Sequence, residues 1–208
     1  MRKSKRIKKS NSWKIKQHRD QFFKKSKTLG YRSRASFKLI ELNKKYKFLK
    51  RNTNLLDLGS FPGGWSQVAS QIIRAGRIMS IDIKNMDPIK DVRFFKGDIL
   101  SNETKSAVIK YFKFNLDVIL SDMAADTTGN KSLDSIRTNQ LCADVINFSK
   151  ETLKPKGVLV SKIFMGEDFL EVKNLAKSTF NKVNFFKPKS SRKESKETYL
   201  HCEILKTL

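Results

Sequence analysis

The stretch DLGSFPGGWSQ, residues 57–67, decides how this chain folds. The apolar run TNLL leads into it, and a helical pattern containing Trp65, Val68 and Ala69 follows. Apolar residues at i, i+3 and i+4 predict the buried face of a helix. The glycines and the proline therefore occupy a turn between a buried strand and a helix. Such a turn lets the backbone approach a ligand closely, and the helix offers free N–H groups.

Strand and helix patterns alternate along the rest of the chain. Apolar runs predict six more strands, at residues 76–83, 92–99, 116–124, 157–164, 182–188 and 198–205. Further helices are predicted within residues 32–49, near 102–112, at 133–154 and at 169–180. Nearly continuous apolar strands that alternate with helices predict an α/β fold with a mainly parallel sheet and helices on both faces. No internal repeat and no second core is apparent in the sequence.

The charge of the chain indicates a polyanionic partner. Its 208 residues carry a formal net charge of +24, and such an excess usually reflects nucleic acid binding. Residues 1–30 alone contain twelve Lys or Arg and a single acid, Asp20, with Trp13, Phe22 and Phe23 interleaved. We interpret residues 1–29 as a basic arm that contacts RNA phosphates and bases, and residues 30–208 as one domain. The alternative for the arm is a solubilising tail.

Other compositional features argue against several classes of site. Cys142 and Cys202 lie far apart in apolar stretches, which predicts buried thiols rather than a disulfide or a metal site. His18 and His201 are the only histidines, so no metal site is expected. The basic N-terminus lacks the apolar run of a secretory signal, and no stretch reaches membrane-spanning length. A cytoplasmic protein without a membrane partner is therefore expected, and a monomer, because nothing indicates an oligomer.

Three acids at the ends of successive predicted strands suggest a nucleoside site. Asp57, Asp82 and Asp98 end the first three strands, and ligands of open α/β sheets bind beyond the carboxyl ends of strands. Asp82 is placed to accept ribose hydroxyls, and Asp98 to accept an adenine amino group. The turn lacks the G-x-G-x-x-G of dinucleotide sites, and a single strand-end acid also occurs as a helix cap. Together the three acids favour S-adenosylmethionine, a nucleoside with a positively charged end.

Seven motifs resemble, in their order, those of the FtsJ family. They are YRSRASFKL, DLGSFPGGWSQ, MDPI, GD, SDMA, SKIFMGE and SSRKESKETY, and they cover the chain from about residue 30 onward. The resemblance implies a Rossmann-like methyltransferase fold and methylation of RNA ribose 2′-hydroxyls with S-adenosylmethionine. The ribosomal branch is the most similar. It implies a uridine in the A loop of large-subunit (23S) ribosomal RNA, methylated on the assembled 50S subunit.

The resemblance also implies the residues of the site. Those predicted to bind the cofactor are Gly63, Trp65, Asp82, Asp98 and Asp122. The family's catalytic tetrad corresponds here to Lys38, Asp122, Lys162 and Glu197.

Each member of the tetrad is expected to have its own role. Lys162 is expected to be the general base, which requires its pKa to fall so that it is neutral. Lys38 would supply the positive charge that lowers this pKa. Asp122 would orient Lys162, and Glu197 would position Lys38 or the ribose.

One departure and two other functions remain open. The family commonly has proline and asparagine after SDMA, whereas this chain has Ala125 and Asp126, which puts the path of the substrate-side loop in doubt. Methylation of tRNA ribose by the same chemistry is the first alternative. The second is a non-catalytic RNA-binding assembly factor, which would be expected to lose a tetrad residue or the turn glycines. Neither has been lost here.

Overall fold

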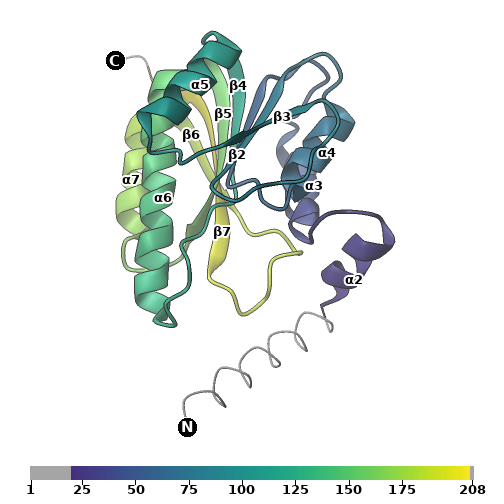
Figure 1. Ribbon diagram of the computed structural model, residues 1–208. Helices are drawn as coiled ribbons and strands as arrows, with labels where there is room; N and C mark the ends of the chain where they lie inside the picture. The colour runs from purple at the N-terminus through teal and green to yellow at the C-terminus, as the bar shows by residue number, and fades with distance from the viewer. Residues whose placement is uncertain (1–19, 207–208) are drawn as a thin grey trace.

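A seven-stranded sheet forms the centre of the computed structural model, which describes residues 20–206 (Figure 1). Its strand order is β3-β2-β1-β4-β5-β7-β6. The strands are β1 (Leu55–Leu58), β2 (Ile78–Asp82), β3 (Val92–Lys96), β4 (Leu116–Ser121), β5 (Leu153–Phe164), β6 (Phe180–Phe186) and β7 (Glu197–Leu205). β7 is antiparallel to β5 and β6, and the other neighbouring pairs are parallel. This confirms the predicted, mainly parallel α/β sheet.

Helices cover both faces of the sheet, as predicted. They are α2 (Gln21–Thr28), α3 (Ala35–Tyr46), α4 (Gly64–Ile72), α5 (Asn102–Phe112), α6 (Lys131–Thr152) and α7 (Phe169–Thr179). In Figure 1, α3 and α4 lie on one side of the sheet, and α6 and α7 lie on the other. Leu39 and Trp65 of the first pair join one buried cluster, whereas Val108, Val145 and Val172 of α5, α6 and α7 join the second.

The order of the strands determines where a ligand can bind. The chain passes from β1 outward to β2 and β3, and then returns to place β4 on the other side of β1. The crossovers that follow β1 and β4 therefore diverge, which opens a crevice at the carboxyl ends of these two strands. The glycine turn follows β1, and Asp122 follows β4 directly.

Helix α2 belongs to the folded body although it lies within the predicted arm, residues 1–29. Asp20 caps α2 by accepting hydrogen bonds from the N–H groups of Phe22 and Phe23, at 3.0 and 3.2 Å. The same carboxylate forms an ion pair with Arg34, and the ring of Phe22 packs 5.5 Å from that of Phe37. The rest of the predicted arm, residues 1–19, lies outside the described residues, and its role stays a prediction.

The junction of α6 and β5 differs from the sequence prediction, which placed the helix at 133–154. The side chain of Asn130 caps α6 through the N–H groups of Ser132 and Leu133, so the helix begins two residues earlier. β5 follows at once, because Leu153 already pairs with Leu116 of β4. The long strand β5 therefore starts four residues before the predicted position.

Both cysteines are buried and free, as predicted. Burial raises the pKa of the Cys142 thiol to about 12, so this thiol is uncharged and unreactive. Within residues 20–206, no group of His, Cys, Asp and Glu side chains is arranged to hold a metal ion. In the same range no helix has the length and apolar character needed to cross a bilayer.

Candidate active site

The four residues of the predicted tetrad lie together at the carboxyl ends of β4 and β5. Both carboxylate oxygens of Glu197 lie 2.8 Å from Lys38 Nζ, and Asp122 Oδ1 lies 2.7 Å from Lys162 Nζ. Two longer ion pairs connect these two close pairs: Lys38–Asp122 at 3.8 Å and Lys162–Glu197 at 3.7 Å. Each lysine therefore contacts both acids, and the formal charges of the four groups balance.

The sheet registers explain why residues so distant in sequence meet here. Ser121 of β4 pairs with Ser161 of β5, so Asp122 and Lys162 follow on adjacent strands. β7 runs in the opposite direction, and its register aligns Glu197 with Phe164 and Tyr199 with Lys162. α3 adds Lys38 from one face of the sheet, on the same buried side as its apolar residues.

Burial and pairing act against each other on the two acids. Burial alone raises the pKa of a carboxyl group, because it disfavours the charged form. The ammonium groups of Lys162 and Lys38 outweigh burial and hold the pKa of both Asp122 and Glu197 below their usual range. Both carboxylates are therefore ionised at neutral pH.

The expectation that Lys162 is neutral is wrong for the site as it stands. Burial lowers the pKa of this lysine and is the largest single influence on it. The carboxylates of Asp122 and Glu197 together outweigh burial, so that the pKa of Lys162 is raised above its usual value. The sequence reasoning counted burial and the charge of Lys38 but not two ionised acids within 4 Å. Lys162 thus carries a proton in the absence of ligands.

Tyr199 is a fifth member of this cluster, and sequence reasoning missed it. Its side chain is fully buried, and its hydroxyl donates to Asp122 Oδ1 at 2.5 Å and accepts from Lys38 Nζ at 3.0 Å. Burial and the charges of Asp122 and Glu197 raise its pKa well above the usual value, so the phenol is neutral. The signal was its position two residues after Glu197, because alternate residues of a strand share a face.

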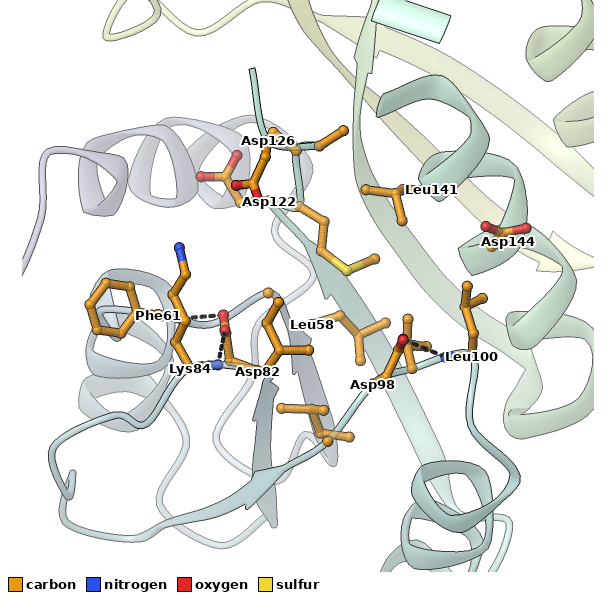
Figure 2. A pocket seen from close by; sticks show the side chains of 18 of the residues that line it. Leu58, Phe61, Asp82, Lys84, Asp98, Leu100, Asp122, Asp126, Leu141 and Asp144 are labelled. Atoms are coloured by element: carbon orange, nitrogen blue, oxygen red, sulfur yellow. Dashed lines mark hydrogen bonds between the residues drawn. The ribbon is translucent and has the colours of Figure 1, made fainter. Parts of the chain in front are cut away.

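A cavity of about 590 Å³ opens beside the tetrad, at the carboxyl ends of β1, β2 and β4 (Figure 2). Its lining includes Lys84 and Arg137 and five carboxylates, those of Asp82, Asp98, Asp122, Asp126 and Asp144. In a chain of net charge +24, an acidic hollow is suited to a ligand that carries positive charge. Leu58, Ile83 and Leu100 add apolar surface to the same cavity. This combination fits the base, ribose and sulfonium of S-adenosylmethionine.

Of the three strand-end acids predicted to form the nucleoside site, Asp82 and Asp98 line this cavity and Asp57 does not. The carboxylate of Asp82 accepts the N–H groups of Phe61 and Lys84, at 2.9 and 2.8 Å, and Asp98 accepts that of Leu100 at 3.0 Å (Figure 2). A carboxylate has about four acceptor sites, so each acid can still accept from a ligand. Their assignment to ribose and adenine stays a prediction.

Gly63 and Trp65, also predicted to bind the cofactor, do not line the large cavity. A Cβ atom on Gly63 would lie 2.9 Å from side-chain atoms of Met86 and Ile89, and the residue has a φ of +103°. Packing within the protein and backbone conformation are therefore enough to require glycine at position 63. The indole of Trp65 is buried and donates to the carbonyl of Ala35 at 2.8 Å, and the residue lines a second, smaller cavity.

A smaller cavity of about 150 Å³ adjoins the large one and shares Gly59, Phe61 and Asp122 with it. Ser33 and Ser60 also line it, and their buried hydroxyls have no hydrogen-bond partner among residues 20–206. Buried hydroxyls are rarely left unpaired, so this cavity fits a polar ligand group. The amino-acid end of S-adenosylmethionine is such a group.

Gly59 of the glycine turn was not singled out from the sequence as a site residue, whereas Asp57 was one of the three strand-end acids expected there and lines the smaller cavity. Gly59 lines both cavities with a φ of +69°, and a Cβ atom there would lie 2.4 Å from Met123 Cγ. Asp57 is fully buried in β1, where Ser66 donates to it at 2.5 Å. Burial chiefly raises the pKa of Asp57 to about 7, and the nearby charges of Asp122 and Asp82 contribute.

The two residues that depart from the family pattern, Ala125 and Asp126, both line the cavity. The N–H of Ala125 donates to Thr138 Oγ1 at 3.2 Å, and the carbonyl of Asp126 accepts from Arg137 at 3.2 Å. α6 therefore holds this loop in place, and Asp126 adds its carboxylate to the lining.

Comparisons with known proteins identify the family of this chain. The FtsJ-like methyltransferase family model matches residues 31–204. A Pelagibacter ubique protein named ribosomal RNA large subunit methyltransferase E is 45% identical, over 95% of this chain and 97% of its own length.

Two solved structures have a similar fold. One, from Plasmodium falciparum and provisionally described as a ribosomal RNA methyltransferase, is 35% identical with a TM-score of 0.72, over 84% of this chain and 98% of that one. The other, from Streptococcus mutans, is provisionally described as a methyltransferase in complex with SAH. Its TM-score is 0.52 at 14% sequence identity, over 83% of this chain and 96% of that one, so it shows the fold alone. The sheet is thus the Rossmann-like one of methyltransferases, and this chain belongs to the FtsJ-like methyltransferase family.

Proposed function

We propose that this chain methylates the ribose 2′-hydroxyl of a uridine in the A loop of large-subunit ribosomal RNA, with S-adenosylmethionine as methyl donor and the assembled subunit as substrate. The name of the Pelagibacter ubique relative supports a large-subunit ribosomal RNA substrate. The net charge of +24 is suited to an RNA partner.

One observation carries this proposal: the tetrad and the acidic cavity share Asp122. Its carboxylate lines the cavity and also lies 2.7 Å from Lys162 Nζ. A methyl donor in the cavity and a hydroxyl beside Lys162 would therefore meet across a single residue. Alignment of two reactants in this way is a large part of catalysis when the electrophile is already reactive.

The donor, when bound, supplies a methyl group on a positively charged sulfur. Asp82 and Asp98 are proposed to accept its ribose hydroxyls and adenine amino group, and the smaller cavity to take its amino-acid end. Asp122 is proposed to face the positive charge. Gly59 and Trp65, which line the smaller cavity, would form the remaining wall, and Gly63 would allow the turn that places them.

The protein has one proton to manage, that of the ribose hydroxyl. Lys162 is protonated in the free site because Asp122 and Glu197 outweigh its burial. A cation bound against Asp122 offsets one of these two acids, so the pKa of Lys162 is expected to fall when donor and RNA are both bound. Lys162 would then release its own proton to solvent and, once neutral, accept the proton of the ribose hydroxyl while the ribose oxygen forms its bond to the methyl carbon and the bond from that carbon to sulfur breaks. Lys38 and Glu197 would hold their positions, and Tyr199 would keep Asp122 in place.

Mapping of ribose methylation on ribosomal RNA and tRNA, in strains with and without the gene, tests the proposal. We expect one A-loop uridine to lose its 2′-O-methyl group on deletion, and a plasmid copy to restore it. The purified protein should methylate 50S subunits isolated from the deletion strain. Loss of a tRNA ribose methyl group instead would assign the same chemistry to tRNA. An unchanged RNA modification pattern would contradict the enzymatic role.

A further inference from the structure

One face of α3 holds the chain segment that leads into Glu197. Arg34, Lys38 and Glu41 are spaced four and three residues apart, which puts them on the same side of the helix. Arg34 donates to the carbonyl of Ser190, and Lys38 contacts Glu197. The carboxylate of Glu41 accepts the N–H groups of Lys189 and Ser190, at 2.6 and 3.0 Å. Arg34 and Glu41, which have no assigned role, thus lie on either side of Lys38 in the sequence and form hydrogen bonds to the turn at 188–191.

The next residue of that turn, Ser191, contacts the tetrad directly. Its side-chain hydroxyl donates to Glu197 Oε1 at 2.8 Å, and the residue is only 6% exposed. Its N–H bonds to the carbonyl of Pro188 at 3.0 Å, which closes the turn. The carboxylate of Glu197 is therefore held from two directions, by Lys38 of α3 and by Ser191 of the turn.

The orientation of Glu197 matters because this acid contacts both lysines. Its Oε2 lies 3.7 Å from Lys162 Nζ, beyond hydrogen-bond distance, while its contacts to Lys38 are short. Rotation of the carboxylate would change its distance to Lys162 and hence the charge that Lys162 experiences. A donor fixed on Oε1 limits this rotation and also stabilises the ionised form of the acid.

We propose that Ser191 is a positioning residue of the methyl transfer, which fixes the carboxylate of Glu197, and that Arg34 and Glu41 hold the turn that presents it. This inference deepens the proposed function and rests on it. The segment SSRKESKETY, which the sequence marks as one motif, thereby carries two linked parts of the site: the donor Ser191 and the acceptor Glu197.

The chain offers a matched control beside this residue. Ser190 is fully buried in the same turn, and its side-chain hydroxyl has no partner among residues 20–206. Ser190→Ala and Ser191→Ala thus remove the same group from adjacent buried positions, but only the second removes a bond to the tetrad. Any general effect on packing of the turn should be common to both.

The experiment compares wild type, Ser190→Ala and Ser191→Ala in methyl transfer to 50S subunits, with donor affinity measured by calorimetry. We expect Ser191→Ala to lower kcat about three- to tenfold, the effect of losing one ordinary intramolecular hydrogen bond, with unchanged donor affinity. Ser190→Ala should keep the wild-type kcat. Glu41→Gln, which retains one acceptor oxygen, should change kcat in the same direction as Ser191→Ala.

A second readout does not depend on turnover. In protein with carbon-13 at its glutamate carboxyl groups, the Glu197 signal is assigned through Glu197→Gln. We expect this signal to titrate at higher pH in Ser191→Ala than in wild type and Ser190→Ala. The charged and titratable groups that face Glu197 remain in all three proteins; they are Lys38, Lys162, Asp122 and Tyr199.

The outcomes separate this inference from the proposed function. Equal kcat and equal titration of Glu197 in the two alanine variants would overturn the role of Ser191. A loss of kcat in both alanine variants would show that Ser191 acts only through general packing of the turn, which would contradict its positioning role. Absence of methyl transfer by the wild-type protein would overturn the proposed function, while the titration would still report whether Ser191 holds Glu197.

Discussion

Asp122 holds Lys162 through two different groups. Its side-chain Oδ1 lies 2.7 Å from Lys162 Nζ, and its main-chain carbonyl accepts a hydrogen bond from the same nitrogen at 2.8 Å. An ammonium group has three N–H bonds, so two are committed to one residue. The same nitrogen also forms a longer ion pair with Glu197 Oε2 at 3.7 Å, so the two acids together hold the ammonium group.

Lys162→Arg tests whether that nitrogen accepts a proton. Guanidinium stays protonated at any working pH, so we expect Lys162→Arg to lose methyl transfer to 50S subunits by at least about 1000-fold. Donor and RNA binding, measured by calorimetry and filter binding, should change little. The wild-type rate should rise with pH and then level off, and Lys38→Ala should move this inflection upward. Lys177→Arg, at an exposed position of α7, is the control and should keep the wild-type rate. Near wild-type turnover of Lys162→Arg would leave alignment alone as the source of catalysis.

Asp82→Ala tests the nucleoside end of the cavity. Loss of a charged acceptor for ribose hydroxyls should weaken S-adenosylmethionine binding by roughly 1–3 kcal/mol, measured by calorimetry. Asp82 also accepts hydrogen bonds from the N–H groups of Phe61 and Lys84, so Asp82→Asn is the milder substitution. The donor affinity of Asp82→Asn should lie between those of the wild type and Asp82→Ala. Equal affinity in all three folded proteins would remove Asp82 from the site.

Asp57 should make the free energy of unfolding depend on pH. Its pKa is raised from 3.8 to about 7 in the folded protein, so folding favours its protonated form. The resulting stabilisation is complete below pH 3.8 and is lost as the pH rises toward about 7. With 1.36 kcal/mol per pKa unit, the loss is at most about 4 kcal/mol.

Asp57→Asn should remove this dependence, because an amide does not titrate. We expect urea unfolding, followed by circular dichroism, to show a flatter profile between pH 4 and 8 and higher stability at pH 8. Asp91→Asn, at an exposed carboxylate, is the control. A wild-type and an Asp57→Asn profile of equal slope would contradict the raised pKa.

A deletion of residues 1–19, which ends before α2, tests whether the predicted arm contacts RNA. Residues 1–19 contain nine Lys or Arg and no acid, whereas Asp20 caps α2 and pairs with Arg34. Removal of 1–19 should keep donor affinity and thermal stability, and should weaken RNA binding. The log–log salt slope should fall by about 0.7–0.9 for each lost phosphate contact. An unchanged slope would make the segment a solubilising tail.

Local pattern predicted the elements well and the interactions between them less well. The apolar runs identified the seven strands of the described sheet. The runs of β1, β2 and β4 are nearly continuous because both faces of these parallel strands are buried. Helix α2 was missed because its basic residues outnumber its apolar ones, and its stability depends on Arg34 and Phe37, which lie beyond it in sequence. Asp20 was a readable capping signal.

The site shows the same division. The motifs supplied the tetrad, but the charge of Lys162 depends on distances between strands that no spacing in the sequence reveals. The contact of Ser191 with Glu197 was missed because it depends on the turn at 188–191, which the sequence does not reveal. Tyr199 was missed although its position two residues after Glu197 was a readable signal. The motif identified Gly63 and Trp65 as cofactor-binding residues. In the structure, neighbouring side chains leave no room for a Cβ atom on Gly63, and the Trp65 indole is hydrogen-bonded within the protein.

The place of β7 in the sheet has a consequence for biosynthesis. This strand is inserted between β5 and β6, and it carries Glu197, whose partner Lys38 lies 159 residues earlier. Synthesis proceeds from the N-terminus, so β5 and β6 emerge from the ribosome with the position between them unfilled. The four charged groups of the tetrad can meet only after residue 197 has left the exit tunnel. Assembly of the tetrad therefore has to wait until β7, the last strand of the described sheet in chain order, has been made.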